Sequence, residues 1–276
     1  MANILVKNKY LILRRITQIS VMALYILANA YGVNFLMGNL SASLVLGVVP
    51  LSDPYAIVQM LFAGAVLSVD VLIGALIITI FYMAIGGRAF CSWVCPVNII
   101  TDAANYLRRK LGFNQIQKKQ PATRYMRYWV IAISLVISFF MGVAAFELVS
   151  PISMVHRGLI FGLGFGWATI LVIFLFDLFV LKNGWCGHVC PLGGFYSLIG
   201  RFSFIRVNHN VDNCTSCMKC KVVCPEDQVL FMVTKESKPV LSGECTNCAR
   251  CIEVCDDDAL NFSIKNFKQE KKNEVK

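Results

Sequence analysis

Eight cysteines in the C-terminal quarter of the chain form two runs with the same spacing, C-x2-C-x2-C-x3-C. Thiolates suit iron, and this close spacing lets one short loop surround three corners of an iron–sulfur cube. With this spacing, three cysteines of one run hold a cluster and the fourth ligates the other. The first predicted [4Fe-4S] cluster has the ligands Cys214, Cys217, Cys220 and Cys255. The second predicted [4Fe-4S] cluster has the ligands Cys224, Cys245, Cys248 and Cys251.

A disulfide framework or zinc sites would be the alternative uses of these cysteines. Cytosolic thiols stay reduced, and zinc sites usually use paired C-x2-C motifs rather than two runs of four. The spacing is that of bacterial two-cluster ferredoxins, although Asp256 stands where the second run would usually have proline. Asp256, Asp257 and Asp258 place negative charge near that run. The apolar segments 229–233 and 260–264 predict short strands that frame the clusters.

The rest of the chain is strongly apolar, with 57% hydrophobic and 15% charged residues overall. Soluble domains carry about 25% charged residues, and a helix of roughly 20 apolar residues can cross a bilayer. Four stretches qualify, namely residues 16–36, 57–85, 128–148 and 159–181. We therefore expect an all-α membrane body of four helices, arranged as two repeated hairpins, followed by an α+β ferredoxin domain with two [4Fe-4S] clusters. The predicted divisions are an N-terminal tail (1–15), a membrane domain (16–205), a ferredoxin domain (206–265) and a charged tail (266–276).

The basic residues predict the orientation of the four spans. Of the 26 Lys and Arg residues, 25 fall on one side, and only Arg157 lies in either opposite loop. Cytoplasmic loops collect basic residues, so both termini should be cytoplasmic and the protein should lie in the inner membrane. The net charge of +10 then reflects topology rather than nucleic-acid binding. The start of the chain also resembles a signal peptide, but its apolar stretch continues to Leu36, which favours a retained first span.

The four remaining cysteines belong to an internal repeat. The motif Cys91-x3-Cys95-Pro recurs 95 residues later as Cys186-x3-Cys190-Pro. If the repeat axis lies along the membrane normal, the four thiols meet, and four thiolates are enough for a third cluster. Reduced packing cysteines or a redox-active dithiol are the alternatives that the sequence leaves open. Each motif precedes an amphipathic segment, predicted to lie along the membrane surface with basic residues such as Arg108 facing the lipid headgroups.

The order of these parts resembles the NapH family of membrane ferredoxin-type proteins: four spans, C-S-W-V-C-P after the second, C-G-H-V-C-P after the fourth, and a double-cluster tail. The resemblance covers nearly the whole chain. It implies a quinol dehydrogenase component that takes electrons from menaquinol or ubiquinol in the membrane. It also implies a periplasmic NapG-like ferredoxin-type partner that passes the electrons toward periplasmic nitrate reductase. The sequence contains no C-x2-C-H haem motif and no G-x-G-x-x-G strand-helix motif, so electron relay is favoured over terminal catalysis.

Oxidation of a quinol requires a nonpolar cleft and a group that takes protons. The candidates are Asp70, Glu147 and His156 toward the outer side and Asp177 toward the inner side, and each could instead lie at an interface or pair between helices. A second hypothesis is an iron–sulfur redox or assembly factor for a respiratory metalloenzyme, of the NosR or CcoG type. A third is a scaffold that recruits cytoplasmic proteins. The sequence leaves open how electrons from cytoplasmic clusters would reach the outer side.

Overall fold

The computed structural model describes residues 8–32, 35–112, 124–162, 164 and 166–264. The first seven residues and the predicted charged tail, 266–276, lie outside the described residues. The chain divides into two compact units. The ferredoxin unit comprises residues 1–13, 82–89 and 196–276, and the helical unit comprises residues 14–81 and 90–195.

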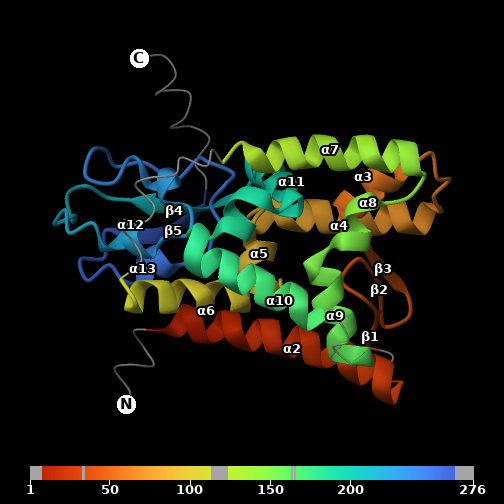
Figure 1. The fold of residues 1–276 in the computed structure, drawn as a ribbon. Helices are drawn as coiled ribbons and strands as arrows, with labels where there is room; N and C mark the ends of the chain where they lie inside the picture. The colour runs from red at the N-terminus through yellow and green to blue at the C-terminus, as the bar shows by residue number, and fades with distance from the viewer. Residues whose placement is uncertain (1–7, 33–34, 113–123, 163, 165, 265–276) are drawn as a thin grey trace. The chain divides into compact units, whose positions relative to one another are not determined.

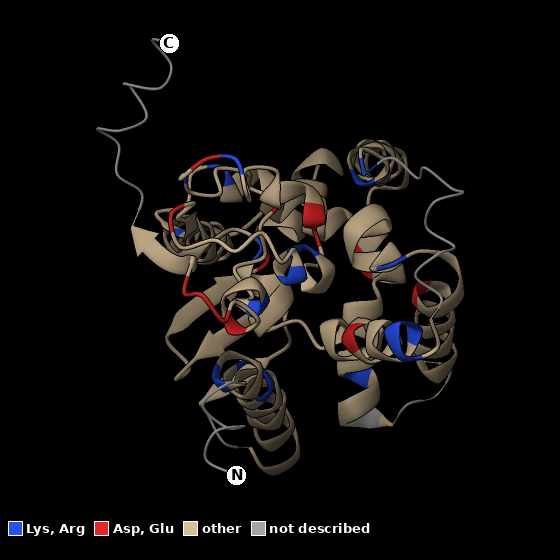
Figure 2. Cartoon of the chain, turned by 90° about the vertical axis from the view of Figure 1, so that its left-hand side faces the viewer, with Lys and Arg blue, Asp and Glu red and all other residues tan. Residues whose placement is uncertain are grey.

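The helical unit is built mainly from apolar helices (Figure 1). Four helices, α2, α4, α5 and α11, contribute residues to both units. The helices are α2 (Lys9–Tyr31), α3 (Pro54–Phe62), α4 (Val69–Ile85), α5 (Ala89–Trp93), α6 (Val97–Lys110), α7 (Met126–Met141), α8 (Ala145–Val149), α9 (Pro151–Phe161), α10 (Gly166–Leu175) and α11 (Pro191–Gly200). Two π-helical turns follow α10, namely η2 (Phe176–Val180) and η3 (Trp185–Val189). Lys, Arg, Asp and Glu are sparse along the helices (Figure 2).

The helical unit also contains a three-stranded antiparallel sheet. The strands are β1 (Leu36–Gly38), β2 (Ala42–Val45) and β3 (Val49–Ser52), in the order β1-β2-β3. Val45 pairs with Val49, and the turn between them has left-handed backbone at Leu46 and Gly47, as tight hairpin turns require. The prediction of a purely helical body was therefore wrong for residues 36–52.

Three of the apolar helical segments are shorter than the predicted spans. Among the described residues, only α2 is long and apolar enough by itself to cross a membrane, whereas α4, α7 and the segment Gly166–Val180 are apolar but have 10–17 residues. Helix α7 ends at Gly142, whose φ of 67° forms a left-handed cap, so the predicted stretch 128–148 is broken there. Gly162, with φ 95°, likewise ends α9 inside the predicted stretch 159–181.

The ferredoxin unit contains a two-stranded antiparallel sheet and three short helices. The elements are β4 (Ile205–His209), β5 (Leu260–Ile264), α12 (Lys219–Val223), η4 (Asp227–Leu230) and α13 (Arg250–Glu253). The predicted strand over 260–264 is confirmed as β5. The predicted strand over 229–233 was wrong, because its residues form the end of the 3-10 helix η4 and a following turn. Val229, Leu230 and Val233 are nevertheless buried in the core.

Three glycines fix the approach to the second cysteine run. A Cβ atom on Gly243 would lie 2.0 Å from the carbonyl oxygen of Ser197, and one on Gly87 would lie 2.0 Å from that of Tyr196. A Cβ on Gly200 would lie 2.7 Å from the carbonyl oxygen of Gly243. Real Cβ atoms do not come this close to backbone, so only glycine permits these segments to pack directly against one another.

Candidate iron–sulfur sites

The two cysteine runs of the ferredoxin unit have the same unusual backbone. Ser216 and Met218 in the first run, and Asn247 and Ala249 at the equivalent positions of the second, have φ between 47° and 60°. This left-handed region costs a non-glycine residue roughly 1–2 kcal/mol. Met218 and Ala249 then cap the short helices α12 and α13. Strained loops repeated at matched positions indicate a backbone shaped to surround a bound group.

The first cysteine run and the last cysteine of the second run lie close together. Burial raises the pKa of the Cys220 thiol, and the neighbouring thiols of Cys255, Cys214 and Cys217 raise it further. The fourth cysteine of the second run is therefore a neighbour of the first run. Cys217 is exposed, Cys214 and Cys255 are partly buried, and Cys220 is buried. This set of thiols is open to solvent on one side.

The second run gathers the last cysteine of the first run in the same way. Burial raises the pKa of the Cys224 thiol, and its thiol neighbours are Cys248 and Cys245. Burial also raises the pKa of Cys245, to about 11. The pKa of Cys251 is raised by burial and by the same three thiols. Without iron these thiols would be protonated at neutral pH, and metal binding would have to release their protons.

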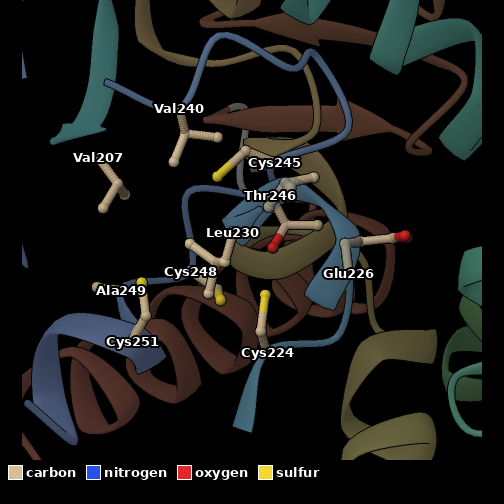
Figure 3. Close-up of a pocket in the computed structure, with 11 residues that line it drawn as sticks. Val207, Cys224, Glu226, Leu230, Val240, Cys245, Thr246, Cys248, Ala249 and Cys251 are labelled. Carbon is tan, nitrogen blue, oxygen red and sulfur yellow. The ribbon is translucent and has the colours of Figure 1, made fainter. Parts of the chain in front are cut away.

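The second set lines a cavity in the ferredoxin unit. Figure 3 shows the sulfur atoms of Cys224, Cys245, Cys248 and Cys251 around one space, with Val240 and Leu230 among the apolar residues beside them. Its empty volume, including the open mouth, is ≈ 350 Å³. Backbone N–H groups of Glu226 and Asn247 donate hydrogen bonds to the sulfur atoms of Cys224 and Cys245. Such hydrogen bonds favour the thiolate that iron requires.

Among the described residues, no group of three or more Cys, His, Asp or Glu side chains forms a site for a single metal ion. A single zinc ion holds sulfur atoms about 2.3 Å away. A cube instead gives each cysteine its own iron and accepts a wider spread of sulfur atoms. The four-thiol sets, the apolar lining and the matched loops all fit a cluster of this kind.

The two C-x3-C-P motifs meet in the helical unit. Cys95 and Cys190 are buried, and Cys91 and Cys186 are partly buried. Burial raises the pKa of Cys95, with Cys91 and Cys190 as neighbouring thiols. Burial raises the pKa of Cys186 as well, and its thiol neighbours are Cys190, Cys95 and Cys91. The two pairs of thiols are separated by 95 positions in the sequence, yet all four form one group.

A polar stripe on α6 holds the second motif against the first. The Cys186 thiol donates to Thr101 Oγ1 at 3.9 Å. One turn further along, Asn105 Nδ2 donates to Asn183 Oδ1 at 2.7 Å. At the end of the stripe, Arg108 Nη1 donates to the carbonyl oxygens of Asp177 and Leu178, each at 3.1 Å. These residues recur every three or four positions, so they share one face of the helix.

The buried position of Arg108 contradicts the prediction that it faces lipid headgroups, because its side chain is 1% exposed. The alternation of apolar and polar residues in α6 did predict an amphipathic helix. It did not reveal that the polar face is buried in protein.

Gln18 on α2 supports the first motif, since its Nε2 donates to the carbonyl oxygens of Ser92 and Cys95, both at 3.2 Å.

The four quinol-site candidates do not form one site, since no hydrogen bond or ion pair joins any two of them within the described part of the chain. Asp70 is exposed in the first turn of α4. Glu147 accepts hydrogen bonds from Ser41 Oγ at 2.6 Å and Ser153 Oγ at 2.5 Å. Asp177 is fully buried, and its Oδ1 accepts from the backbone N–H of Trp185 at 2.9 Å.

His156, like Asp177 with its Oδ2 atom, carries a buried polar atom that is open to a polar ligand. Its side chain is 2% exposed, and its ring packs edge-on against Tyr25 with the ring centroids 4.9 Å apart. Its Nε2 atom is buried and has no hydrogen-bond partner among the described residues. Buried polar atoms are usually hydrogen-bonded, so this atom is available to a ligand or a water molecule.

Sequence reasoning missed several polar residues around the thiols, including Gln18, Thr101, Arg88 and Glu226. Isolated polar residues in apolar stretches were the available signal. Arg88 is the sole basic residue between Arg15 and Arg108. Its partner Glu226 is 138 positions away in the chain, and sequence alone could not pair them.

Comparison with known proteins assigns both groups of cysteines to iron–sulfur domains. A family described as a 4Fe-4S binding domain matches residues 67–114 and 163–208, each of which contains one C-x3-C-P motif. A family described as a 4Fe-4S dicluster domain matches residues 206–256. No solved structure matches the chain. The protein is therefore a ferredoxin-type 4Fe-4S electron-transfer protein.

Curated relatives define the family more closely. The methylamine utilization ferredoxin-type protein MauN of Methylorubrum extorquens is 45% identical over 240 residues, which cover 86% of this chain and 83% of the relative. The ferredoxin-type protein NapH of Haemophilus influenzae is 44% identical over a stretch that covers 81% of this chain and 77% of the relative. NapH of Escherichia coli is 42% identical over 84% of this chain and 81% of the relative. The chain belongs to the family of ferredoxin-type proteins that includes NapH and MauN, and the predicted resemblance to NapH is confirmed.

Proposed function

We propose that this protein is the membrane component of a quinol dehydrogenase and relays electrons from menaquinol or ubiquinol through iron–sulfur clusters. The observation that carries the proposal is the gathering of all twelve cysteines into three groups of four. Two groups would hold the [4Fe-4S] clusters with the ligand sets stated from the sequence. Each cluster takes one electron, so two clusters match the two electrons of a quinol.

The outward faces of the long helices support a membrane location. On α7 the buried residues are Arg127, Ser134 and Ser138, whereas Trp129 and Phe140 are 70% and 80% exposed. Helix α7 thus exposes apolar residues and buries polar ones, which is the reverse of the pattern in a helix of a soluble protein. On α2, Arg14 and Gln18 are likewise fully buried while Ile16 and Ile19 are more than half exposed. Lipid is the environment in which such a pattern is stable.

Helix length bears on how four spans would fit the bilayer. The 17 residues of α4 reach roughly 25 Å at 1.5 Å per residue, against about 30 Å of hydrocarbon. The shorter helices would be extended by α3, α8 and α9, or the bilayer would thin around them. The uneven distribution of Lys and Arg supports cytoplasmic termini, and with them an inner-membrane protein whose ferredoxin unit faces the cytoplasm.

The four thiols of the C-x3-C-P motifs would hold a third [4Fe-4S] cluster. They are contributed equally by the two halves of the repeat and lie within the residues matched by a 4Fe-4S binding domain. Cys95 and Cys190 are buried, and Cys91 and Cys186 are partly buried. A redox-active dithiol remains the alternative chemistry for the same group. The quinol site would use one of Asp70, Glu147, His156 and Asp177. Two of them carry a buried atom without a hydrogen-bond partner among the described residues, namely His156 Nε2 and Asp177 Oδ2.

The electron acceptor would be a periplasmic NapG-like ferredoxin-type protein and, through it, nitrate reductase. A second candidate function has the same electron-transfer chemistry but serves methylamine utilization. It is favoured by the identities to two MauN proteins, 45% and 44%, which match or exceed the 44% and 42% to NapH, although a third MauN is 38% identical.

Electron flux in cells tests the proposal. In a strain that depends on this chain for nitrate respiration, Cys245→Ala should reduce quinol-dependent nitrate reduction at least about tenfold, because one electron carrier is lost. Reduction driven by a viologen dye, which bypasses the relay, should remain nearly normal. Lys235→Gln, at an exposed position, is the matched control. Undiminished quinol-dependent flux in Cys245→Ala would contradict the proposal, and loss of the dye-driven activity as well would favour the assembly-factor hypothesis. Normal nitrate flux together with a defect in growth on methylamine would support the second candidate.

A further inference from the structure

An ion pair is buried beside the second cysteine set. Arg88 Nη1 lies 2.5 Å from Glu226 Oε1, and both side chains are 1% exposed. The same Nη1 donates to the carbonyl oxygen of Glu244 at 3.0 Å. Gln228 Nε2 donates to the other oxygen of Glu226 at 2.8 Å and to Glu244 Oε2 at 2.7 Å. The Glu226 carboxylate is thus held from both sides.

This pair is electrically coupled to the thiols of the second set. Glu226 lines the same cavity as Cys224 and Cys245, with its carboxylate directed away from the sulfur atoms (Figure 3). Glu226 follows Cys224 by two residues, and its backbone N–H donates a hydrogen bond to the sulfur of Cys224. Arg88 donates to the carbonyl oxygen of Glu244, the residue directly before Cys245. The positive and negative charges of the pair therefore act on the same group of sulfur atoms with opposite sign.

Neutralisation matters because a cluster gains one negative charge when it is reduced. A carboxylate in a buried site of low dielectric constant would oppose that gain strongly, and the charges around a cluster are among the factors that set its reduction potential. A buried ion pair is also poor evidence for a purely stabilising role, since well-packed apolar residues often serve as well. We propose that Arg88 is a positioning residue that neutralises Glu226 and thereby sets the reduction potential of the cluster bound by Cys224, Cys245, Cys248 and Cys251.

This inference rests on the proposed function, because it requires a cluster at those four cysteines. The test is a potentiometric titration of the purified full-length protein, followed by electron paramagnetic resonance, at about pH 8 so that carboxyl groups are ionised. Arg88→Gln leaves an unpaired negative charge and should lower the potential of one cluster. Glu226→Gln leaves an unpaired positive charge and should raise the potential of that same cluster. Arg88→Gln combined with Glu226→Gln leaves no net charge and should return it close to the wild-type value.

The control is the surface pair of Lys238 and Glu236, which has the same 2.5 Å separation but is 42% and 54% exposed. Lys238→Gln should change the reduction potential of no cluster, because solvent screens exposed charges. If Arg88→Gln fails to fold, the shift in Glu226→Gln and its reversal in the double variant still decide the question. Unchanged potentials in Glu226→Gln would overturn the inference while leaving the proposed function intact. Wild-type protein without a cluster at this site would instead overturn the proposed function itself.

Discussion

Replacing Cys224 with alanine removes the cluster of the second run, although Cys224 belongs to the first run in sequence. The expected loss is about four of the irons bound per chain, since alanine offers no ligand atom to a [4Fe-4S] cube. The reason is the position of Cys224 among Cys245 and Cys248. Cys255→Ala should conversely remove the cluster of the first run, because Cys255 is a neighbour of Cys220.

Iron analysis and electron paramagnetic resonance of anaerobically purified variants provide the measurement. Cys224→Ala and Cys245→Ala should lose the same signal, and Cys255→Ala and Cys214→Ala should lose the other. Thr215→Ala is the control, because Thr215 lies next to Cys214 but its hydroxyl donates to Asp257 at the surface. The crossed ligand assignment is wrong if Cys224→Ala and Cys214→Ala abolish the same signal.

The group of four thiols in the helical unit predicts the second large effect. Wild-type protein should contain about twelve irons per chain from three cubes. Cys95→Ala and Cys190→Ala should each reduce this to about eight and leave both ferredoxin signals in place. The physical reason is that the two motifs contribute two thiols each to one group, so replacement of one cysteine leaves only three ligands for a cube.

Thr79→Ala is the control for this experiment, since its hydroxyl is bonded within its own helix to the carbonyl oxygen of Ala75. About eight irons in the wild-type protein, with no change in Cys95→Ala, would exclude a third cluster. Thiol labelling would then test the dithiol alternative. Formation of a disulfide that includes Cys95 or Cys186 on mild oxidation would support the dithiol alternative.

The sequence predicted the parts of the sites whose chemistry is local. The C-x2-C-x2-C-x3-C spacing places three thiols on one loop, and the two runs of this chain have left-handed backbone at equivalent positions. The strand at 260–264 was predictable because apolar and polar residues alternate there. The segment 229–233 was not, because a short run of buried apolar residues looks alike in a strand, a turn or a helix.

Other features depended on contacts between distant residues. The hairpin of β2 and β3 had a turn signal in Leu46-Gly47, but it lay between the predicted spans 16–36 and 57–85, and no strand was predicted there. Helix breaks at Gly142 and Gly162 follow from positive φ angles that a hydropathy pattern does not reveal. The spacing of the residues from Thr101 to Arg108 predicted a polar helix face. The burial of that face could not be predicted, because it depends on contacts with distant residues such as Asn183.

The most direct test of the central claim is the reoxidation of reduced protein by a quinone. Full-length protein in lipid nanodiscs is reduced with dithionite, freed of excess reductant, and mixed anaerobically with a menaquinone or ubiquinone analogue while the visible absorbance of the clusters is followed. Electron relay between quinol and clusters predicts that the absorbance recovers rapidly, with a rate that rises and then saturates as quinone concentration increases. Recovery no faster than in the absence of quinone, in protein that contains its full complement of iron, would contradict it.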